Sequence, residues 1–136
     1  MMWKTVVRWG ETDAAGFVFY PTYFGWFDEA THYYLTALGL SSVDLFSRDR
    51  IGVPIFEAKA VFRAALHFGD SIRVSSAVDA IERKTFRVAH QVWRGETLVA
   101  EGYEVRGWVQ FGPEGAKAGT IPEYVRDLFQ RSNPTL

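Results

Sequence analysis

The sequence contains no cysteine, which excludes disulfide bonds, thiolate-bound metals, iron–sulfur clusters and a cysteine nucleophile. We therefore expect a cytoplasmic protein. The net charge is also small, because 15 Lys and Arg residues stand against 16 Asp and Glu residues, giving -1. No strong field is available to attract a nucleic acid or an anionic membrane. No apolar run reaches the ~18 residues of a membrane span, and residues 1–10 do not resemble a signal peptide, so we expect no membrane partner and no nucleic-acid partner.

Several sequence motifs of common enzyme classes are also missing. No serine nucleophile elbow, phosphate-binding loop or dinucleotide fingerprint is present, so phosphoryl transfer and hydride transfer have no support. His32, His67 and His90 are scattered without the spacing of metal ligands. We expect no metal site.

Aromatic residues are abundant and make up 16% of the 136 positions. Seven of them lie between Phe17 and Phe27, a density that needs a large apolar partner surface. Hydrophobic residues amount to 48% and charged residues to 23%, which is the balance of a folded protein. The length suits a single domain over residues 1–136.

The apolar pattern predicts an α+β fold. Helical spacing begins at Pro21, which suits a first turn because it has no N–H to leave unpaired, and stops at Gly39, a candidate left-handed cap. Alternation with a period of two predicts strands before and after this helix. The expected elements are strands over Trp3–Trp9, Pro54–Leu66, Ser71–Ile81, Thr85–Arg94 and Thr97–Phe111, a connector with at most a short helical turn over Ser41–Arg50, a loop over Gly112–Gly119 and a helix over Pro122–Arg131.

The expected arrangement is a sheet of about five strands, the last four in an antiparallel meander, curled around the long helix. In the strand after the connector, the even positions from Phe56 to Leu66 are apolar and are expected to face the core. Trp93, Tyr103 and Trp108 are expected on the outer face of the sheet, which must then be covered. A second copy of the chain is the simplest partner that would cover this face, so we expect a homo-oligomer.

Asp13 lies in a loop just before the long helix. A carboxylate there can act as a nucleophile or as a general base for water. Unpaired N–H groups of the first helical turn, near Tyr20, Thr22 and Tyr23, can polarise a carbonyl as an oxyanion hole does. Together they form the minimum set for attack on a carbonyl with a good leaving group. The alternative is that Asp13 only caps its own loop, a common role for Asp.

The same loop carries the pattern Asp-x-x-Gly-x-Val-x-Tyr-Pro-x-Tyr, formed by Asp13, Gly16, Val18, Tyr20, Pro21 and Tyr23. This pattern resembles the 4-hydroxybenzoyl-CoA thioesterase type of the hot-dog fold acyl-CoA thioesterase superfamily. The resemblance implies a curled antiparallel sheet around one central helix and homodimers, or dimers of dimers, with active sites at the dimer interface. It also implies hydrolysis of an acyl-CoA to free acid and coenzyme A. Coenzyme A is then part of the substrate, and no cofactor is expected.

Carried over residue by residue, the resemblance assigns catalysis to the Asp13 carboxylate and to the amide of Tyr20, which would polarise the thioester carbonyl. Gly16 and Tyr23 would lie beside the substrate. The carboxylate of such proteins either forms a mixed anhydride or activates water. Asp28 matches a position where a helix carboxylate of the neighbouring subunit accepts a hydrogen bond from a phenolic acyl group of the substrate, which makes a hydroxyaryl acyl group worth testing. The alternative is that Asp28 belongs to an ordinary polar helix face.

The resemblance assigns two further segments to the coenzyme A portion of the substrate. Val53, Pro54 and Ile55 would supply backbone at the pantetheine arm, or would simply begin a buried strand. Arg83 and Lys84 would bind the nucleotide phosphates, a task that suits two cations in a turn, or would form a solvated charged turn.

The nucleotide site departs from the family pattern, because Glu82 stands where an additional Arg occurs and Val43 replaces an aromatic residue. Glu29 is a helix carboxylate of the kind that another hot-dog branch uses, but that branch's surrounding motif is missing here, so Asp13 is the expected catalytic residue. Two alternative functions stay open: a thioesterase for acyl groups on carrier protein, and a non-catalytic acyl-CoA-binding hot-dog module.

Overall fold

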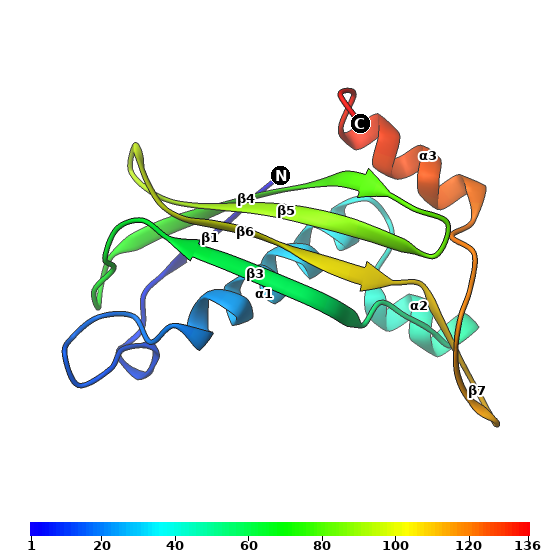
Figure 1. Cartoon of the computed structure of the whole chain (residues 1–136), viewed down its shortest axis with the longest axis horizontal. Helices are drawn as coiled ribbons and strands as arrows, with labels where there is room; N and C mark the ends of the chain where they lie inside the picture. Colours follow the sequence, from blue (N-terminus) through cyan, green and yellow to red (C-terminus); the bar gives the residue numbers. More distant parts are fainter.

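Figure 1 shows an antiparallel sheet curled around one long helix, in a computed structural model that describes residues 1–136. None of the helices has the length and apolarity needed to cross a membrane. The main sheet consists of β1 (Met2–Val6), β3 (Ile55–Phe62), β4 (Ser71–Ile81), β5 (Thr85–Arg94) and β6 (Thr97–Gly107). A second sheet consists of β2 (Ile51–Gly52), β7 (Val109–Gly112) and β8 (Gly115–Ala118). The helices are α1 (Pro21–Ala37), α2 (Ser42–Asp49), α3 (Glu123–Ser132) and the 3-10 helix η1 (Trp9–Glu11).

The predicted long helix is α1, and the sequence explains both of its ends. Pro21 occupies the first turn, where its missing N–H costs nothing. Gly39 follows the helix with φ +83°, a conformation that a residue with a Cβ rarely adopts, and Leu40 N–H donates to Leu35 O at 2.8 Å. The buried residues recur with helical spacing. They are Tyr23, Trp26, Phe27, Ala30, Thr31, Tyr34 and Leu35.

The strand order in the main sheet is β1-β4-β5-β6-β3, with every pair antiparallel. The five curled strands and the α+β class are therefore confirmed. The predicted four-strand meander is wrong in one respect, because β3 pairs with β6 and not with β4. The chain after β3 crosses to the opposite edge of the sheet, where Val7 N–H donates to Asp70 O at 2.9 Å. Apolar alternation marks the two faces of a strand, but it does not specify the neighbouring strand.

A layer of buried polar residues divides the core into two apolar clusters. One cluster contains Phe129 of α3, and the other contains Leu66 and lies toward the loop before α1. Along β4, Val74 belongs to one cluster and Val78 to the other, with the buried Ser76 between them. The layer consists of Thr31, Ser76, His90 and Glu104, and Arg106 extends it.

The last predicted strand is interrupted after β6. Trp108 N–H donates to Lys84 O at 2.9 Å, and the chain then continues as β7 in the second sheet. The expectation that Trp108 lies on the outer face is wrong, since its side chain is 5% exposed. Trp108 shares an inward face with Glu104 and Arg106. Charged residues normally mark the solvent side of a strand, so the pattern here indicates the wrong face.

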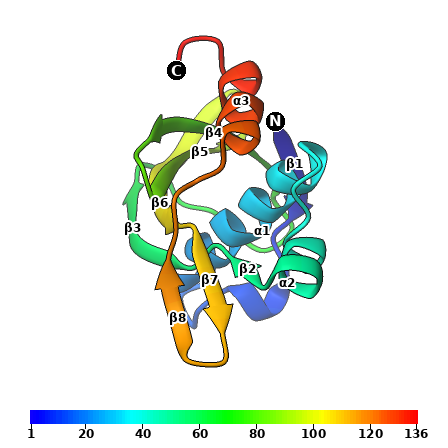
Figure 2. The same ribbon diagram turned by 90° about the vertical axis from the view of Figure 1, so that its right-hand side faces the viewer.

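Three connecting segments contain more regular structure than the sequence predicts. The predicted connector contains α2, a full helix whose start is capped when the Ser41 side chain accepts from Asp44 N–H. The predicted loop over Gly112–Gly119 contains β8, which forms a projecting hairpin with β7 (Figure 2). β1 ends at Val6, before the predicted end at Trp9, and Trp9 instead begins η1.

β3 is an open edge of the main sheet. Its side chains Ile55, Phe56 and Phe62 are 45%, 58% and 49% exposed, respectively. The expected core-facing side is confirmed for Phe62, which pairs with the buried Ala100 and contacts the Tyr23 ring, but the ring stays half exposed at the sheet edge. Phe56 lies at a bulge between Ile55 and Glu57 and is exposed. β3 is the outermost strand, with no strand on its free side, so these side chains are only partly covered within the chain.

The outer face of the sheet is more charged than predicted. Arg87 Nε lies 2.7 Å from Asp79 Oδ1, and the Arg87 guanidinium lies over the Tyr103 ring at 5.5 Å. Arg73 covers the Trp93 ring at the same distance. Arginines thus partly cover the half-buried rings of Trp93 and Tyr103 within the chain.

A substitution at Gly102 in β6 tests the attachment of β3. A Cβ at this position would lie 1.9 Å from Lys59 O, which belongs to the backbone of β3 and cannot move aside alone. We expect Gly102→Ala to lower the free energy of unfolding by about 1–3 kcal/mol in urea titrations, the usual range for overpacking. Gly25→Ala is the control, because a Cβ there meets no atom within 4 Å, and helix propensity makes the change neutral or stabilising. Equal stabilities of the two variants would contradict the close approach of β3.

Candidate active site

Asp13 closes a tight turn in the loop between η1 and α1. Its Oδ1 accepts hydrogen bonds from Ala15 N–H at 2.9 Å and from Phe17 N–H at 3.2 Å. Gly16 permits the turn because its φ is +86°, and its N–H donates to Asp13 O at 3.0 Å. The Oδ2 atom has no partner within the chain. Asp13 therefore does cap its loop, as the alternative interpretation held, but it uses only one carboxylate oxygen for this and leaves the other free to react.

Tyr20 immediately precedes α1 and holds an unpaired N–H at this helix start. Thr22 N–H donates to Phe19 O at 2.9 Å, and Tyr23 N–H donates to Tyr20 O at 3.3 Å. The expectation of free N–H groups at Thr22 and Tyr23 is thus wrong, because a tight first turn uses both. Pro21 has no N–H, and Tyr20 N–H has no acceptor in the chain. The positive end of the helix dipole adds to its strength as a donor.

An apolar cavity of about 350 Å³ opens beside this loop. Tyr20 and Tyr23 line one side, and the end of β3 with Phe62 lines the other. Tyr23 packs its ring edge-on against Phe62 at 4.9 Å, and burial raises the pKa of its phenol, an effect that the charge of Arg94 partly opposes. Phe17 also lines the cavity and donates its N–H to Asp13, so the carboxylate is one hydrogen bond away from the cavity wall.

Glu11 anchors the loop to α1, a role that sequence reasoning missed. Its Oε2 accepts from the indole N–H of Trp26 at 3.0 Å, and its Oε1 accepts from Arg8 N–H at 2.8 Å. The carbonyl oxygen of Glu11 also accepts from Phe19 N–H at 2.9 Å. The one signal in the sequence is the Trp26 indole N–H, which needs an acceptor when it is buried.

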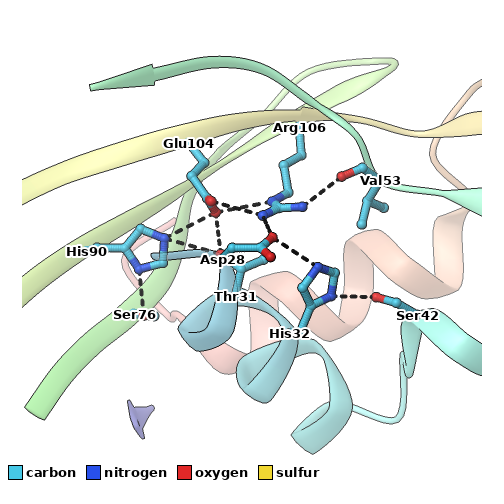
Figure 3. Close-up of polar contacts among 9 residues, drawn as sticks. All are labelled: Asp28, Thr31, His32, Ser42, Val53, Ser76, His90, Glu104 and Arg106. Carbon is cyan, nitrogen blue, oxygen red and sulfur yellow. Dashed lines mark hydrogen bonds and ion pairs between the residues drawn. The ribbon is translucent and has the colours of Figure 1, made fainter. Parts of the chain in front are cut away.

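Asp28 lies on the exposed side of α1, but it is more than a polar helix position. Its Oδ1 accepts from Arg106 Nη2 at 2.7 Å and lies 3.2 Å from His32 Nε2 (Figure 3). His32 Nδ1 in turn contacts Ser42 Oγ of α2 at 2.7 Å. Arg106 Nη1 donates to Val53 O at 2.9 Å. The predicted acyl-binding residue and the start of the predicted pantetheine segment therefore meet at one guanidinium.

Glu104 receives hydrogen bonds from three sides in the polar layer that divides the core. Arg106 donates from Nε to Oε1 at 3.1 Å and from Nη2 to Oε2 at 2.9 Å, while Thr31 and His90 also contact Oε1. Burial by itself would raise the pKa of Glu104, but the hydrogen bonds from His90 and Arg106, the charge of Arg106 and the hydrogen bond from Thr31 lower it to about 2. Ser76 fixes the other ring nitrogen of His90 at 2.7 Å. The residues Thr31, His90, Glu104 and Arg106 were not predicted.

The residues assigned to coenzyme A do not gather around Asp13 in one chain. Val53 and Pro54 use their carbonyl groups for Arg106 and for Gly107 N–H, respectively. Arg83 and Lys84 lie in the turn between β4 and β5, at the opposite end of the sheet from the Asp13 loop (Figure 1). No cluster of His, Asp and Glu side chains in the chain is arranged to hold a metal ion.

Comparison with known proteins places this geometry in a family. Residues 7–129 match the thioesterase-like superfamily. The chain belongs to this superfamily. It is 30% identical over 107 residues to the 1,4-dihydroxy-2-naphthoyl-CoA hydrolase of Prochlorococcus marinus strain MIT 9313, covering 74% of this chain and 70% of that protein.

Solved structures of thioesterases in this superfamily have the same hot-dog fold. A gentisyl-coenzyme A thioesterase superposes with a TM-score of 0.84 at 36% identity, over 95% of this chain and 98% of that one. The 4-hydroxybenzoyl-CoA thioesterase of Pseudomonas sp. strain CBS-3 superposes with a TM-score of 0.88 at 26% identity, over 94% and 97% of the two chains. The predicted superfamily and fold are confirmed.

The buried Glu104 makes stability depend on pH in a defined window. Its pKa is about 2 in the folded protein against an ordinary value of 4.5, so its contribution is complete above pH 4.5 and is lost as pH falls toward 2. At 1.36 kcal/mol per pH unit this amounts to about 3 kcal/mol. We expect Glu104→Gln to be less stable than wild type at pH 7 and the difference to shrink below pH 4.5, in urea titrations at a series of pH values. The exposed Glu96→Gln is the control, and a pH-independent difference for Glu104→Gln would contradict the assignment.

Proposed function

We propose that this protein is an acyl-CoA thioesterase that converts a hydroxyaryl-CoA and water into the free acid and coenzyme A. The observation that carries the proposal is the Asp13 carboxylate, with Oδ1 fixed by two backbone N–H groups and Oδ2 free, in the loop that leads to the unpaired N–H of Tyr20. A held carboxylate and an unpaired donor at a helix start are the two groups that attack on a thioester carbonyl requires.

The proposed chemistry uses the free Oδ2 of Asp13 in either of two ways. Oδ2 attacks the thioester carbon to give a mixed anhydride that water then cleaves, or it removes a proton from a water molecule that attacks the same carbon. In both cases the C–S bond breaks, the sulfur leaves as the thiolate of coenzyme A, and Tyr20 N–H stabilises the oxyanion. Coenzyme A is part of the substrate, and the proposal includes no cofactor or metal.

A hydroxyaryl acyl group is favoured by the site and by the relatives. Three proteins similar to this chain are named for 1,4-dihydroxy-2-naphthoyl-CoA, 4-hydroxybenzoyl-CoA and gentisyl-coenzyme A. A solved structure similar to this chain is an Asp-to-Asn variant of a 4-hydroxybenzoyl-CoA thioesterase in complex with 4-hydroxybenzoyl-CoA. Here Asp28 offers a free carboxylate oxygen that accepts a hydrogen bond from a phenolic hydroxyl, and the apolar cavity beside Tyr20 suits an aromatic ring.

The proposed active site is completed by a second copy of the chain. Asp28 lies eight residues beyond Tyr20, about 12 Å along the helix axis. The turn between β4 and β5, which holds Arg83 and Lys84, lies at the opposite end of the sheet from the Asp13 loop. β3 offers an unpaired strand edge with exposed Ile55, Phe56 and Phe62 side chains. These features support a homodimer, or a tetramer of such dimers, in which Asp13 of one subunit and Asp28 of the other face the same substrate.

The reaction is tested by release of free thiol from a panel of thioesters with wild type and Asp13→Asn. The panel comprises 4-hydroxybenzoyl-CoA, 1,4-dihydroxy-2-naphthoyl-CoA, benzoyl-CoA, hexanoyl-CoA and one acyl-carrier protein. We expect the hydroxyaryl-CoA thioesters to be the best substrates and kcat to fall at least ~100-fold in Asp13→Asn, the usual loss for a positioned acid–base group.

Three results would contradict this proposal in different ways. Hydrolysis of the acyl-carrier protein alone would indicate a carrier-protein thioesterase. Binding of acyl-CoA without turnover would indicate a non-catalytic binding module. Full activity of Asp13→Asn would exclude the proposed mechanism, and the exposed Asp127→Asn serves as the matched control for the substitution.

The shared site is tested by mixing two variants that each lack one of the two carboxylates. If Asp13 and Asp28 act across the interface, a heterodimer of Asp13→Asn and Asp28→Asn contains one site with both wild-type carboxylates. Since half of randomly mixed dimers are heterodimers and half of their sites are intact, we expect the intact sites to contribute about a quarter of wild-type activity on 4-hydroxybenzoyl-CoA, above the residual activity of either variant refolded alone. The measurement is thiol release after the variants are mixed, denatured and refolded together. No recovery, or a monomeric mass in sedimentation, would exclude the shared site.

A further inference from the structure

The geometry points to Arg106 as the positioning residue that sets the acyl-group preference of this enzyme, by fixing Asp28 relative to the chain segment at Val53. The inference rests on the proposed function, because it concerns how the same site selects its substrate. Arg106 does not contact the substrate. It acts through two residues that lie on separate elements and that are assigned to separate parts of the substrate.

One guanidinium makes both connections (Figure 3). Nη2 donates to Asp28 Oδ1 at 2.7 Å, on α1, and Nη1 donates to Val53 O at 2.9 Å, between β2 and β3. Asp28 is assigned to the acyl hydroxyl and Val53 to the pantetheine arm. The planar guanidinium has a fixed shape, so it sets the separation of these two acceptors.

The guanidinium is itself held rigidly from the buried side. Its Nε and Nη2 donate to the two oxygens of Glu104 at 3.1 and 2.9 Å, and the Arg106 side chain is 3% exposed. Thr31 and His90 fix the position of Glu104. A bidentate pair in the core leaves the arginine little freedom to rotate.

The contacts of Asp28 use its Oδ1 atom and hold the carboxylate in one orientation, with Oδ2 free. Oδ1 is shared by Arg106 and His32, and the His32 ring is fixed by Ser42 Oγ on α2. Oδ2 has no partner within the chain, and the Asp28 side chain is 51% exposed. The carboxylate thus presents Oδ2 to a ligand and cannot rotate without breaking an ion pair whose arginine is buried.

Two separable effects follow for variants of Arg106. Loss of the contact with Asp28 lowers the preference for acyl groups that carry a hydroxyl. Loss of the contact with Val53 weakens binding of every acyl-CoA, with or without a hydroxyl. A substitution of Asp28 produces the first effect alone, so Arg106→Lys and Asp28→Asn differ in a predictable way.

The test measures binding without turnover. The probes are 4-hydroxyphenacyl-CoA and phenacyl-CoA, thioethers in which a methylene separates the aryl ketone from the sulfur and which therefore cannot be hydrolysed. Calorimetry gives the ratio of their Kd values for each variant. We expect wild type to prefer the hydroxylated probe, and the preference to fall roughly 10- to 100-fold in Asp28→Asn and in Arg106→Lys, as for loss of a hydrogen bond to a charged group. The double variant is expected to lose no more preference than either single variant, because both substitutions remove the same interaction.

A paired substitution separates positioning from folding. Arg106→Gln alone leaves Glu104 charged and unpaired in the core, which is strongly destabilising. The double variant Glu104→Gln with Arg106→Gln removes both charges at similar volume, and circular dichroism establishes that it is folded. We expect this folded variant to lack the hydroxyl preference, whereas a purely structural role for Arg106 would leave the preference at the wild-type ratio.

The outcomes distinguish this inference from the proposed function. A wild-type preference in folded Arg106→Lys and in the paired variant would overturn the role of Arg106 while leaving hydrolysis intact. Equal Kd values of the two probes for wild type would overturn it as well, since Asp28 would then select no hydroxyl. Absence of thiol release from every thioester would overturn the proposed reaction, and the Kd ratios would still decide the role of Arg106.

Discussion

The interaction on which the structure depends is the buried ion pair of Glu104 and Arg106. Two charges in a core are costly to desolvate, and such a pair stabilises only when every donor and acceptor is satisfied. Here Glu104 accepts from Arg106, Thr31 and His90, and no buried side-chain polar atom lacks a partner. Because these donors come from α1, β5 and β6, the pair fixes the position of the central helix over the sheet. Apolar packing alone would tolerate some sliding of the helix, whereas unsatisfied charges would not.

The position of the Asp13 loop, where the proposed chemistry takes place, depends on that fixed helix. Glu11 connects the loop to Trp26 of α1, and the tight first turn of α1 uses the N–H groups of Thr22 and Tyr23 while that of Tyr20 stays unpaired. Asp13 is held from the other side by the backbone of its own turn. The Asp13 carboxylate and the Tyr20 N–H, the two groups of the proposed reaction, therefore lie on short segments whose ends are attached to rigid elements. This attachment gives a surface loop the precision that attack on a carbonyl requires.

Within a single chain, parts of the proposed site lie far from one another. The Asp13 loop and the turn of Arg83 and Lys84 lie at opposite ends of the sheet, and β3 exposes apolar side chains along a free edge. Monomers rarely leave such an edge uncovered. The charged outer face, in contrast, has its aromatic rings covered by arginines. The apolar surface that a partner would cover is thus at β3 and around the loop, beside the proposed chemistry.

The sequence by itself determined the long helix, the five strands of the main sheet and the position of Asp13 and Tyr20 before a helix start. These features depend on local periodicity, on Pro21 and Gly39 at the helix ends, and on a contiguous motif. The tertiary structure alone decided that β3 pairs with β6, that Trp108 turns inward, and that Asp28, Val53, Glu104 and Arg106 meet. Those residues come from distant segments of the chain. In β6, the inward-facing charges of Glu104 and Arg106 give a sequence pattern that suggests the opposite face is buried. Their burial becomes favourable only when the partners from other elements are in place, and a linear pattern does not contain that information.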